Sequence, residues 1–314
     1  MGKLAFLFPG QGSQKIGMGR DFYEKFPAAH SVFEQANEVL GFDLRALCFE
    51  GPDEALRETE NAQPALYVAS VAAWTCFGEV VGIAPDAVAG HSVGEYAALV
   101  AAGVLDFADG LKLVRRRGEL MRDAAKRKPG TMAAILGLDA DAAREIITET
   151  RDAGAGLVAI ANYNGGGQIV ISGELAAVEA AGERAKARGA KRVIPLNVSG
   201  AFHSPLMVMA GDTLAHTLLE TTWRKPKIPI VSNVTADYVT MPDDLTGGLT
   251  RQISGSVLWE QSMQKLLSDD FDAFVELGSG DVLSNLMKRI DKSARTFSVQ
   301  DAASLEAARE LLTV

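Results

Sequence analysis

The chain has 314 residues, of which 47% are hydrophobic and 23% charged, a composition typical of a globular protein with one or two domains. Its net charge of −9 argues against nucleic acid as a partner, because phosphate binding depends on dense lysine and arginine. With no membrane span or signal peptide evident and only two cysteines in no metal-binding spacing, we expect a cytoplasmic protein with reduced thiols and no metal site.

The first hundred or so residues alternate short apolar runs with helical patterns, which predicts a parallel α/β sheet. Apolar runs at residues 4–8 and 86–89 indicate buried strands. Pro64 stands near the first turn of the second predicted helix, where a missing N–H is tolerated. The helical patterns cover residues 32–40, 64–77 and 95–102.

Between the second strand and the third helix lies the pentapeptide Gly90-His91-Ser92-Val93-Gly94, which matches the G-x-S-x-G pattern. That pattern exposes a serine hydroxyl on a sharp strand-to-helix turn, and its glycines let backbones pass closely, so Ser92 is a candidate nucleophile. The alternative is a capping box, in which Ser92 and Glu95 only satisfy N–H groups of the first helical turn. The capping box leaves both glycines unexplained, and the flanking strand and helix favour the nucleophile.

A helix predicted over residues 107–124 carries one cation in an apolar stripe, because Arg117 shares a face with Leu113, Val114, Leu120 and Met121. Arginine keeps its proton, so a buried Arg117 should meet an internal carboxylate or an anionic ligand. The alternative is that its charged end reaches solvent along the stripe. A planar guanidinium would bind a substrate carboxylate through two parallel hydrogen bonds.

After residue 128 the pattern changes to strand, helix, strand, strand, helix, strand, which is the βαββαβ order of a ferredoxin-like fold. These segments are residues 131–136, 141–150, 157–162, 168–172, 175–188 and 192–198. We predict a ferredoxin-like subdomain at residues 129–198, inserted in an α/β subdomain made of residues 1–128 and 199–314. The chain then returns to α/β texture, with strands expected at 228–234, 271–277 and 296–299 and a helix at 262–267.

A serine nucleophile needs a base, normally a histidine, and the chain has four. His203 lies in a loop at the predicted subdomain boundary, where clefts form, and a loop histidine with ordinary hydrogen bonds is the alternative. His91 adjoins Ser92 but should point away from it, and His30 and His216 lie in amphipathic helical stretches. No acid is identifiable as a third member, so a Ser–His dyad oriented by a neutral group is plausible.

An oxyanion formed on Ser92 needs preorganised N–H donors. In G-x-S-x-G enzymes one donor is the backbone N–H after the serine, here that of Val93. A second should come from the loop at residues 8–14, which follows the first strand and reaches the same sheet edge. A plain turn is the alternative for this loop, and a nucleotide-binding loop fits it badly, because Lys15 stands where G-x-G-x-x-G requires glycine.

Several independent motifs occur in register along the chain. They are residues 8–14, 90–95, 117–121 and 162–173, the loop ending in Phe202-His203, Arg251-Gln252, and residues 276–280. In their order and content they resemble the malonyl-CoA:acyl carrier protein transacylases over essentially the whole chain. The resemblance implies an α/β-hydrolase-like large subdomain with a parallel sheet and a ferredoxin-like insert, in agreement with the pattern above.

By this resemblance, Ser92 attacks a malonyl thioester with His203 as base, which gives a malonyl ester and releases coenzyme A. The phosphopantetheine thiol of acyl carrier protein then takes the malonyl group, in a ping-pong cycle that supplies fatty-acid elongation. The resemblance also implies roles for seven further residues. Backbone N–H groups of Gln11 and Val93 form the oxyanion hole, Arg117 binds the malonyl carboxylate, Gln252 organises the pocket around His203, Asn162 and His91 line the site, and Phe202 opposes a branched methylmalonyl group.

The implied partners are malonyl-CoA and acyl carrier protein, with no bound cofactor. Malonyl loading for polyketide synthesis is a variant of this reaction, whereas a serine hydrolase would share Ser92 and His203 but use water and would not need Arg117. A third hypothesis is a carrier-protein docking module in which the basic clusters at residues 115–117, 126–128 and 186–192 matter and Ser92 is only a helix cap. We expect a monomer, because no heptad repeat or long apolar edge indicates otherwise.

Overall fold

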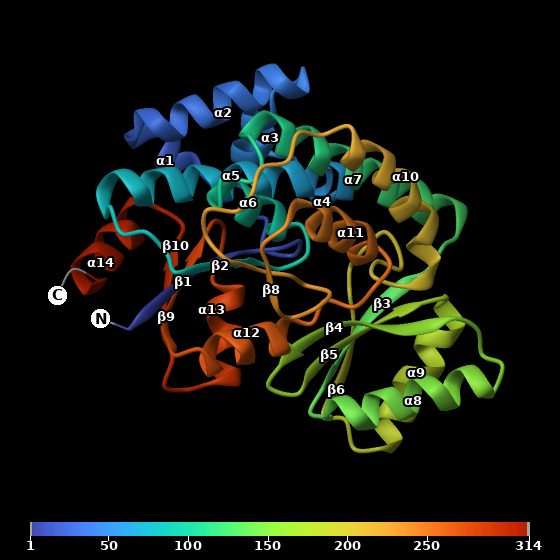
Figure 1. Ribbon diagram of the computed structural model, residues 1–314. Coiled ribbons are helices and arrows are strands. Elements are labelled where there is room, and N and C mark those ends of the chain that lie inside the picture. Colours follow the sequence, from blue (N-terminus) through green and yellow to red (C-terminus); the bar gives the residue numbers. More distant parts are fainter. Residues whose placement is uncertain (1, 313–314) are drawn as a thin grey trace.

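The computed structural model describes residues 2–312 and contains two sheets (Figure 1). The larger has the strand order β10-β9-β1-β2-β7-β8 and is parallel except for β8, which pairs antiparallel with β7. Its strands are β1 (Lys3–Phe8), β2 (Ala87–Gly90), β7 (Ile230–Val231), β8 (Tyr238–Val239), β9 (Phe271–Leu277) and β10 (Arg295–Val299). The predicted parallel α/β sheet is therefore confirmed, and β1 and β2 lie side by side although about eighty residues separate them in sequence.

Helices cover both faces of this sheet because its inner strands are apolar on both sides. Alternate residues of β1 point to opposite cores: Phe6 and Phe8 pack with the larger group of helices, whereas Leu7 packs with α12 and α13. The larger group contains α1 (Arg20–Lys25), α2 (Pro27–Leu40), α3 (Leu44–Glu50), α4 (Asp53–Arg57), α5 (Thr59–Val80), α6 (Gly94–Ala101), α7 (Phe107–Arg127), α10 (Val208–Leu219), α11 (Pro242–Gln252) and α14 (Ala302–Leu312). The smaller group contains α12 (Trp259–Ser268) and α13 (Val282–Ile290).

The second sheet is antiparallel, with the order β4-β5-β3-β6, and two helices cover one of its faces (Figure 1). Its elements are β3 (Thr131–Leu136), α8 (Ala140–Asp152), β4 (Val158–Gly165), β5 (Gln168–Gly173), α9 (Leu175–Ala187) and β6 (Arg192–Pro195). This βαββαβ unit with its second and third strands adjacent is the ferredoxin-like arrangement predicted from the sequence. The proposed division of the chain at residues 129 and 198 stays a prediction.

Helix α5 begins five residues earlier than predicted, so Pro64 lies inside it rather than at its start. Proline has no N–H to donate to the carbonyl oxygen of Glu60, four residues before it. The guanidinium of Arg115 on α7 donates to that oxygen instead, at 2.8 Å. A contact from a neighbouring helix thus satisfies the acceptor that proline leaves open, which local sequence alone does not indicate.

The predicted strand at 228–234 is shorter in the structure, because only Ile230 and Val231 pair with β2 and the chain then turns into β8. The shortening places Asn233 beyond the strand end, where it reaches the site described below. No described helix is long and apolar enough to cross a membrane. Cys48 and Cys76 are both buried and free, and burial raises the pKa of the Cys76 thiol to about 12.

Candidate active site

Ser92 lies on the turn between β2 and α6 with a φ of 53°, in the left-handed region. A Cβ added at Gly90 would lie 2.0 Å from the backbone of Gly94, and one at Gly94 would lie 2.1 Å from the carbonyl oxygen of Phe8. Gly90 is therefore required for the turn to fold closely on itself, and Gly94 is required for it to pass against the end of β1. Helix α6 has no side-chain cap, so the capping-box alternative for Ser92 and Glu95 is wrong.

The hydroxyl of Ser92 lies 2.8 Å from Nε2 of His203. Nδ1 of His203 lies 2.7 Å from the backbone carbonyl oxygen of Gln252, which can only accept a hydrogen bond. Nδ1 therefore carries the proton in the neutral ring, and Nε2 accepts the hydroxyl hydrogen of Ser92. The neutral orienting group considered from the sequence is this carbonyl.

Burial, followed by the nearby Arg117 guanidinium, lowers the pKa of His203 to about 3. The imidazole is therefore neutral at pH 7, which is the state a general base requires. His203 also has a left-handed backbone, with a φ of 56°. Ser92 and His203 are thus both held in sparsely populated conformations, as is common for residues at functional sites.

Arg117 is only 1% exposed, so the alternative in which its charged end reaches solvent is wrong. Its Nη1 donates to Oε1 of Gln63 at 2.7 Å, and its Nη2 donates to Ser92 Oγ and to Gln252 Oε1, both at 3.0 Å. Burial lowers the pKa of Arg117, although an arginine keeps its proton in a protein. None of these partners is an internal carboxylate, and within residues 2–312 the buried Nε has no hydrogen-bond partner.

Gln252 connects the parts of the site. Its Nε2 donates to the backbone oxygen of Ser92 at 3.1 Å and to Oε2 of Glu95 at 2.6 Å. Asn233 holds the turn from the other side, since its Oδ1 accepts from the Ser92 N–H at 2.7 Å and its Nδ2 donates to the Gly90 oxygen at 2.6 Å. Sequence reasoning missed Asn233 and Gln63, and the one available signal for Asn233 was a polar residue at the carboxyl end of a parallel strand.

The loop that follows β1 lies against the Ser92 turn, as expected. A Cβ at Gly10 would lie 2.5 Å from the carbonyl oxygen of His91, and the His91 N–H donates to Phe8 at 3.0 Å. Among the hydrogen bonds of the described chain, none is donated by the backbone N–H of Gln11 or by that of Val93. Both N–H groups are therefore free to stabilise an oxyanion.

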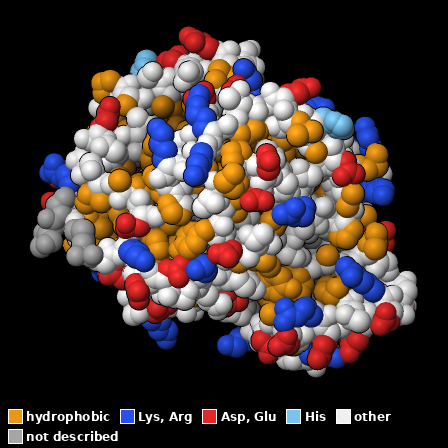
Figure 2. All heavy atoms as spheres, in the orientation of Figure 1, with side chains coloured by type: hydrophobic (Ala, Val, Ile, Leu, Met, Phe, Trp, Pro, Cys, Tyr) orange, Lys and Arg blue, Asp and Glu red, His pale blue; other side chains and the backbone are white. Residues whose placement is uncertain are grey.

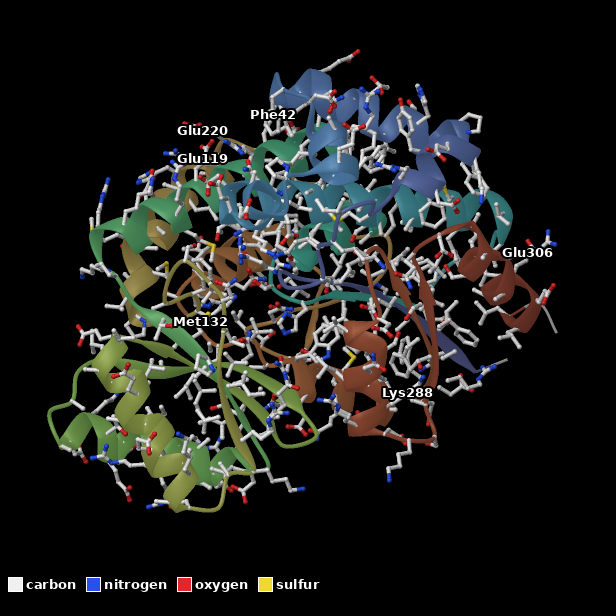
Figure 3. The ribbon with its side chains drawn as sticks, turned by 180° about the vertical axis from the view of Figure 1, so that it is seen from behind. Phe42, Glu119, Met132, Glu220, Lys288 and Glu306 are labelled. Carbon is white, nitrogen blue, oxygen red and sulfur yellow. The ribbon has the colours of Figure 1, made fainter. Side chains whose placement is uncertain are left out.

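A cavity of about 380 Å³ opens in front of Ser92, between the larger sheet and the small antiparallel one. The face of the small sheet that α8 and α9 do not cover supplies Met132, Ala134 and Val170, which are buried with the larger core, whereas the residues that alternate with them pack under α8 and α9. Figure 3 shows Met132 at the junction of the small sheet with the rest of the molecule. The cavity wall also includes the predicted residues Gln11, His91, Arg117, Asn162, Phe202 and His203.

His91 belongs to the cavity wall rather than to the hydrogen-bonded pair of Ser92 and His203. Its Nε2 lies 2.9 Å from Oδ1 of Asn164, and its ring packs 5.4 Å from that of Trp259. His30 stacks on Tyr23 at the surface, and His216 is exposed on α10. No group of metal-ligating side chains that could hold an ion occurs among residues 2–312.

The basic clusters lie mostly on solvated surface, as each was predicted to do individually. Arg188 pairs with Glu145 and Glu149, and Lys186 pairs with Glu183. Figure 2 shows lysine and arginine interspersed with aspartate and glutamate over the face that it draws. The charge pattern alone therefore defines no single anion-binding surface on that face.

A serine on a strand-to-helix turn, paired with a neutral histidine and facing a buried guanidinium, is the arrangement of a serine acyltransferase. The comparisons with known proteins agree, because the model of the acyl transferase domain family matches residues 5–308. The chain belongs to this family and, within it, to the malonyl CoA-acyl carrier protein transacylases. The resemblance found in the sequence is thus confirmed.

Relatives match over almost the whole chain. The malonyl CoA-acyl carrier protein transacylase of Bacillus subtilis is 47% identical, covering 99% of this chain and 98% of its own. The crystal structure of an acyl carrier protein S-malonyltransferase from Vibrio cholerae has a TM-score of 0.94 at 42% identity and covers 98% of this chain and 99% of its own. A malonyl-transacylase in complex with a type II PKS acyl-carrier protein has a TM-score of 0.95 at 41% identity, covering 98% of this chain and 99% of its own.

Proposed function

We propose that this enzyme transfers a malonyl group from malonyl-CoA to the phosphopantetheine thiol of acyl carrier protein, through an ester on Ser92. The observation that carries the proposal is Arg117, a buried cation without a carboxylate partner that donates a hydrogen bond to the Ser92 hydroxyl. A malonyl group has a reactive carbonyl at one end and a carboxylate at the other. The carbonyl can meet Ser92 while the carboxylate meets Arg117.

In the first half-reaction, the lone pair of Ser92 Oγ attacks the thioester carbonyl while Nε2 of His203 takes the hydroxyl proton. The tetrahedral oxyanion is stabilised by the free N–H groups of Gln11 and Val93. Collapse of the intermediate breaks the carbon–sulfur bond, and the coenzyme A sulfur leaves with the proton held by His203. In the second half-reaction, the phosphopantetheine thiol attacks the ester by the same steps in reverse, and the Ser92 hydroxyl is restored.

The other residues position these groups. Gln252 orients His203 through its backbone oxygen and Arg117 through its carboxamide. His91, Asn162 and Phe202 shape the cavity, and the bulk of Phe202 disfavours an added methyl on the acyl group. One methyl changes specificity by about 1–3 kcal/mol, so the preference over methylmalonyl is modest.

The pathway served is fatty-acid elongation, as the resemblance in the sequence implies. Supply of a polyketide carrier protein is the second candidate, because a 41% identical transacylase is known in complex with a type II PKS acyl-carrier protein. Residues 129–198 act in either case as a subdomain that closes one side of the cavity. The monomeric state and the cytoplasmic location stay predictions.

The test is the intact mass of the protein after brief incubation with malonyl-CoA, with acetyl-CoA and methylmalonyl-CoA in parallel. Ser92→Ala is the loss variant, and Ser13→Ala, a serine in the wall of the same cavity, is its matched control. One malonyl adduct on wild type and Ser13→Ala, absent from Ser92→Ala and discharged faster by carrier protein than by water, is the expected result. Steady coenzyme A release without an adduct would indicate a hydrolase. If neither an adduct nor coenzyme A release were detected, the carrier-protein docking module would be the remaining hypothesis.

A further inference from the structure

Glu95 is a buried carboxylate that the proposed reaction does not use. It lies in the first turn of α6, is 2% exposed and is not part of the cavity wall. Its Oε2 accepts hydrogen bonds from Nε2 of Gln252 at 2.6 Å and from the backbone N–H of Asn233 at 3.3 Å. Burying an ionisable side chain against neutral partners is unfavourable, so Glu95 is unlike an ordinary packing residue.

The carboxamide of Gln252 lies between Glu95 and Arg117. Its Oε1 accepts from Arg117 at 3.0 Å, while its Nε2 donates to Glu95 and to the backbone oxygen of Ser92. Because the Asn233 N–H also donates to Oε2 of Glu95, this oxygen is an acceptor in either protonation state of the carboxyl group, and a guanidinium only donates hydrogen bonds. The two groups therefore allow one orientation of the amide, because a rotated amide would place oxygen against two acceptors and NH₂ against the guanidinium.

This orientation decides where the Arg117 guanidinium lies. Besides Gln252, its hydrogen-bond acceptors are Gln63 and the Ser92 hydroxyl. Among the described residues the buried Nε–H has no hydrogen-bond partner, and the ring of Tyr96, 5.9 Å away, packs against the guanidinium. A Gln252 amide free to rotate would withdraw one of the three acceptors that fix the cation beside the nucleophile.

Building on the acyl transfer proposed above, we infer that Glu95 is a positioning residue that acts through Gln252. Its hydrogen bond fixes the Gln252 carboxamide, and the carboxamide holds Arg117 in place for the carboxylate of the acyl group. The consequence is an effect on specificity: acyl groups with a carboxylate depend on Glu95, and acyl groups without one do not. A residue that only stabilised the fold would affect both kinds of substrate equally.

The experiment compares acylation of Ser92 by malonyl-CoA and by acetyl-CoA, followed by intact mass at several substrate concentrations so that kcat and KM are separated. Glu95→Met removes the acceptor but keeps the length and apolar bulk of the side chain. Glu95→Gln is the matched control, because its amide oxygen can still accept from Gln252. Glu95→Ala is run in parallel in case the methionine packs poorly, and thermal unfolding of each variant is recorded.

We expect Glu95→Met and Glu95→Ala to lower the malonyl-to-acetyl ratio of kcat/KM by about tenfold or more, because the buried Gln252 amide donor loses its acceptor. Glu95→Gln should keep the wild-type ratio within about threefold. An unchanged ratio in the methionine and alanine variants would overturn the inference, and so would an equal loss in Glu95→Gln. If wild type itself formed no malonyl adduct, the proposed function would fail first and the inference with it.

Discussion

Replacement of Arg117 by alanine tests the reasoning about substrate most directly. A guanidinium has five N–H donors, and three hydrogen bonds to protein acceptors are made by Arg117. A malonyl carboxylate can accept two parallel hydrogen bonds from the guanidinium when it takes the place of the neutral acceptors that Arg117 contacts in the free enzyme. Hydrogen bonds to charged groups contribute about 1.5–3 kcal/mol each, so losing two removes about 3–6 kcal/mol of binding.

At about 1.4 kcal/mol per factor of ten, the expected loss in kcat/KM for malonyl-CoA is roughly a hundredfold to ten-thousandfold. The rate with acetyl-CoA should fall far less, because its acyl group makes no contact with the guanidinium and only the Arg117–Ser92 hydrogen bond is lost. Arg117 also helps to lower the pKa of His203, so its removal makes the imidazole a stronger base. These two effects oppose each other, and the rate with acetyl-CoA should stay within about tenfold of wild type.

The assay is the rate of coenzyme A release from both thioesters in the presence of carrier protein, with thermal unfolding as a check on folding. Arg116→Ala is the matched control, because this neighbour is 45% exposed and its contact with Glu119 is 3.9 Å long. An equal fall for malonyl-CoA and acetyl-CoA in a folded Arg117→Ala protein would refute the reasoning, and so would an unchanged malonyl rate.

Two further predictions concern stability. Burial raises the pKa of both Glu95 and Glu276 to about 7, so between pH 8 and 6.5 these two groups bind more protons in the folded chain than in the unfolded one. The lowered pKa values of His91 and His203 oppose this gain in part, because the unfolded imidazoles begin to take up protons in the same range. The free energy of unfolding from urea titrations should therefore rise by about 1 kcal/mol from pH 8 to 6.5, and a fall over this range would contradict the assignment. Gly94→Ala would place a Cβ 2.1 Å from the Phe8 oxygen and should cost about 3 kcal/mol. Gly78→Ala in α5 is the control, because the added Cβ meets nothing within 4 Å and should raise the free energy of unfolding by up to about 1 kcal/mol. A similar loss of stability in both variants would contradict the close approach of the Ser92 turn to β1.

Local patterns predicted the elements that carry a strong period. Residues 131–136 and 271–277 form strands with the predicted bounds, because largely apolar segments bounded by turn residues define them. Short helices such as α3 and α4 went unpredicted, since segments of seven and five residues hold too few turns to show a helical period. The strand at 228–234 was predicted too long, because an apolar run does not show how far its partner strand extends.

In the functional site, too, some features are determined by local sequence and others by contacts between distant residues. The glycines and serine of residues 90–94 indicate a nucleophile turn by themselves, because the backbone geometry of that turn is local. The partner of Ser92 lies 111 residues away, and the acceptor for His203 lies a further 49 residues on. A carbonyl oxygen in that role has no sequence signature, since every residue has one.

The sequence by itself determined the alternation of strands and helices, the ferredoxin-like insert, the nucleophile turn and the presence of one cation on an apolar helix face. These follow from hydrophobic period and from residues with special backbone freedom, which act over a few neighbours. Only the tertiary structure decided that Arg117 is fully buried beside Ser92, that Gln252 and Asn233 hold the turn, and that Glu95 fixes an amide rather than capping its own helix. Hydrogen bonds between residues far apart in sequence depend on which strands become neighbours, and that is settled by burial of the whole core.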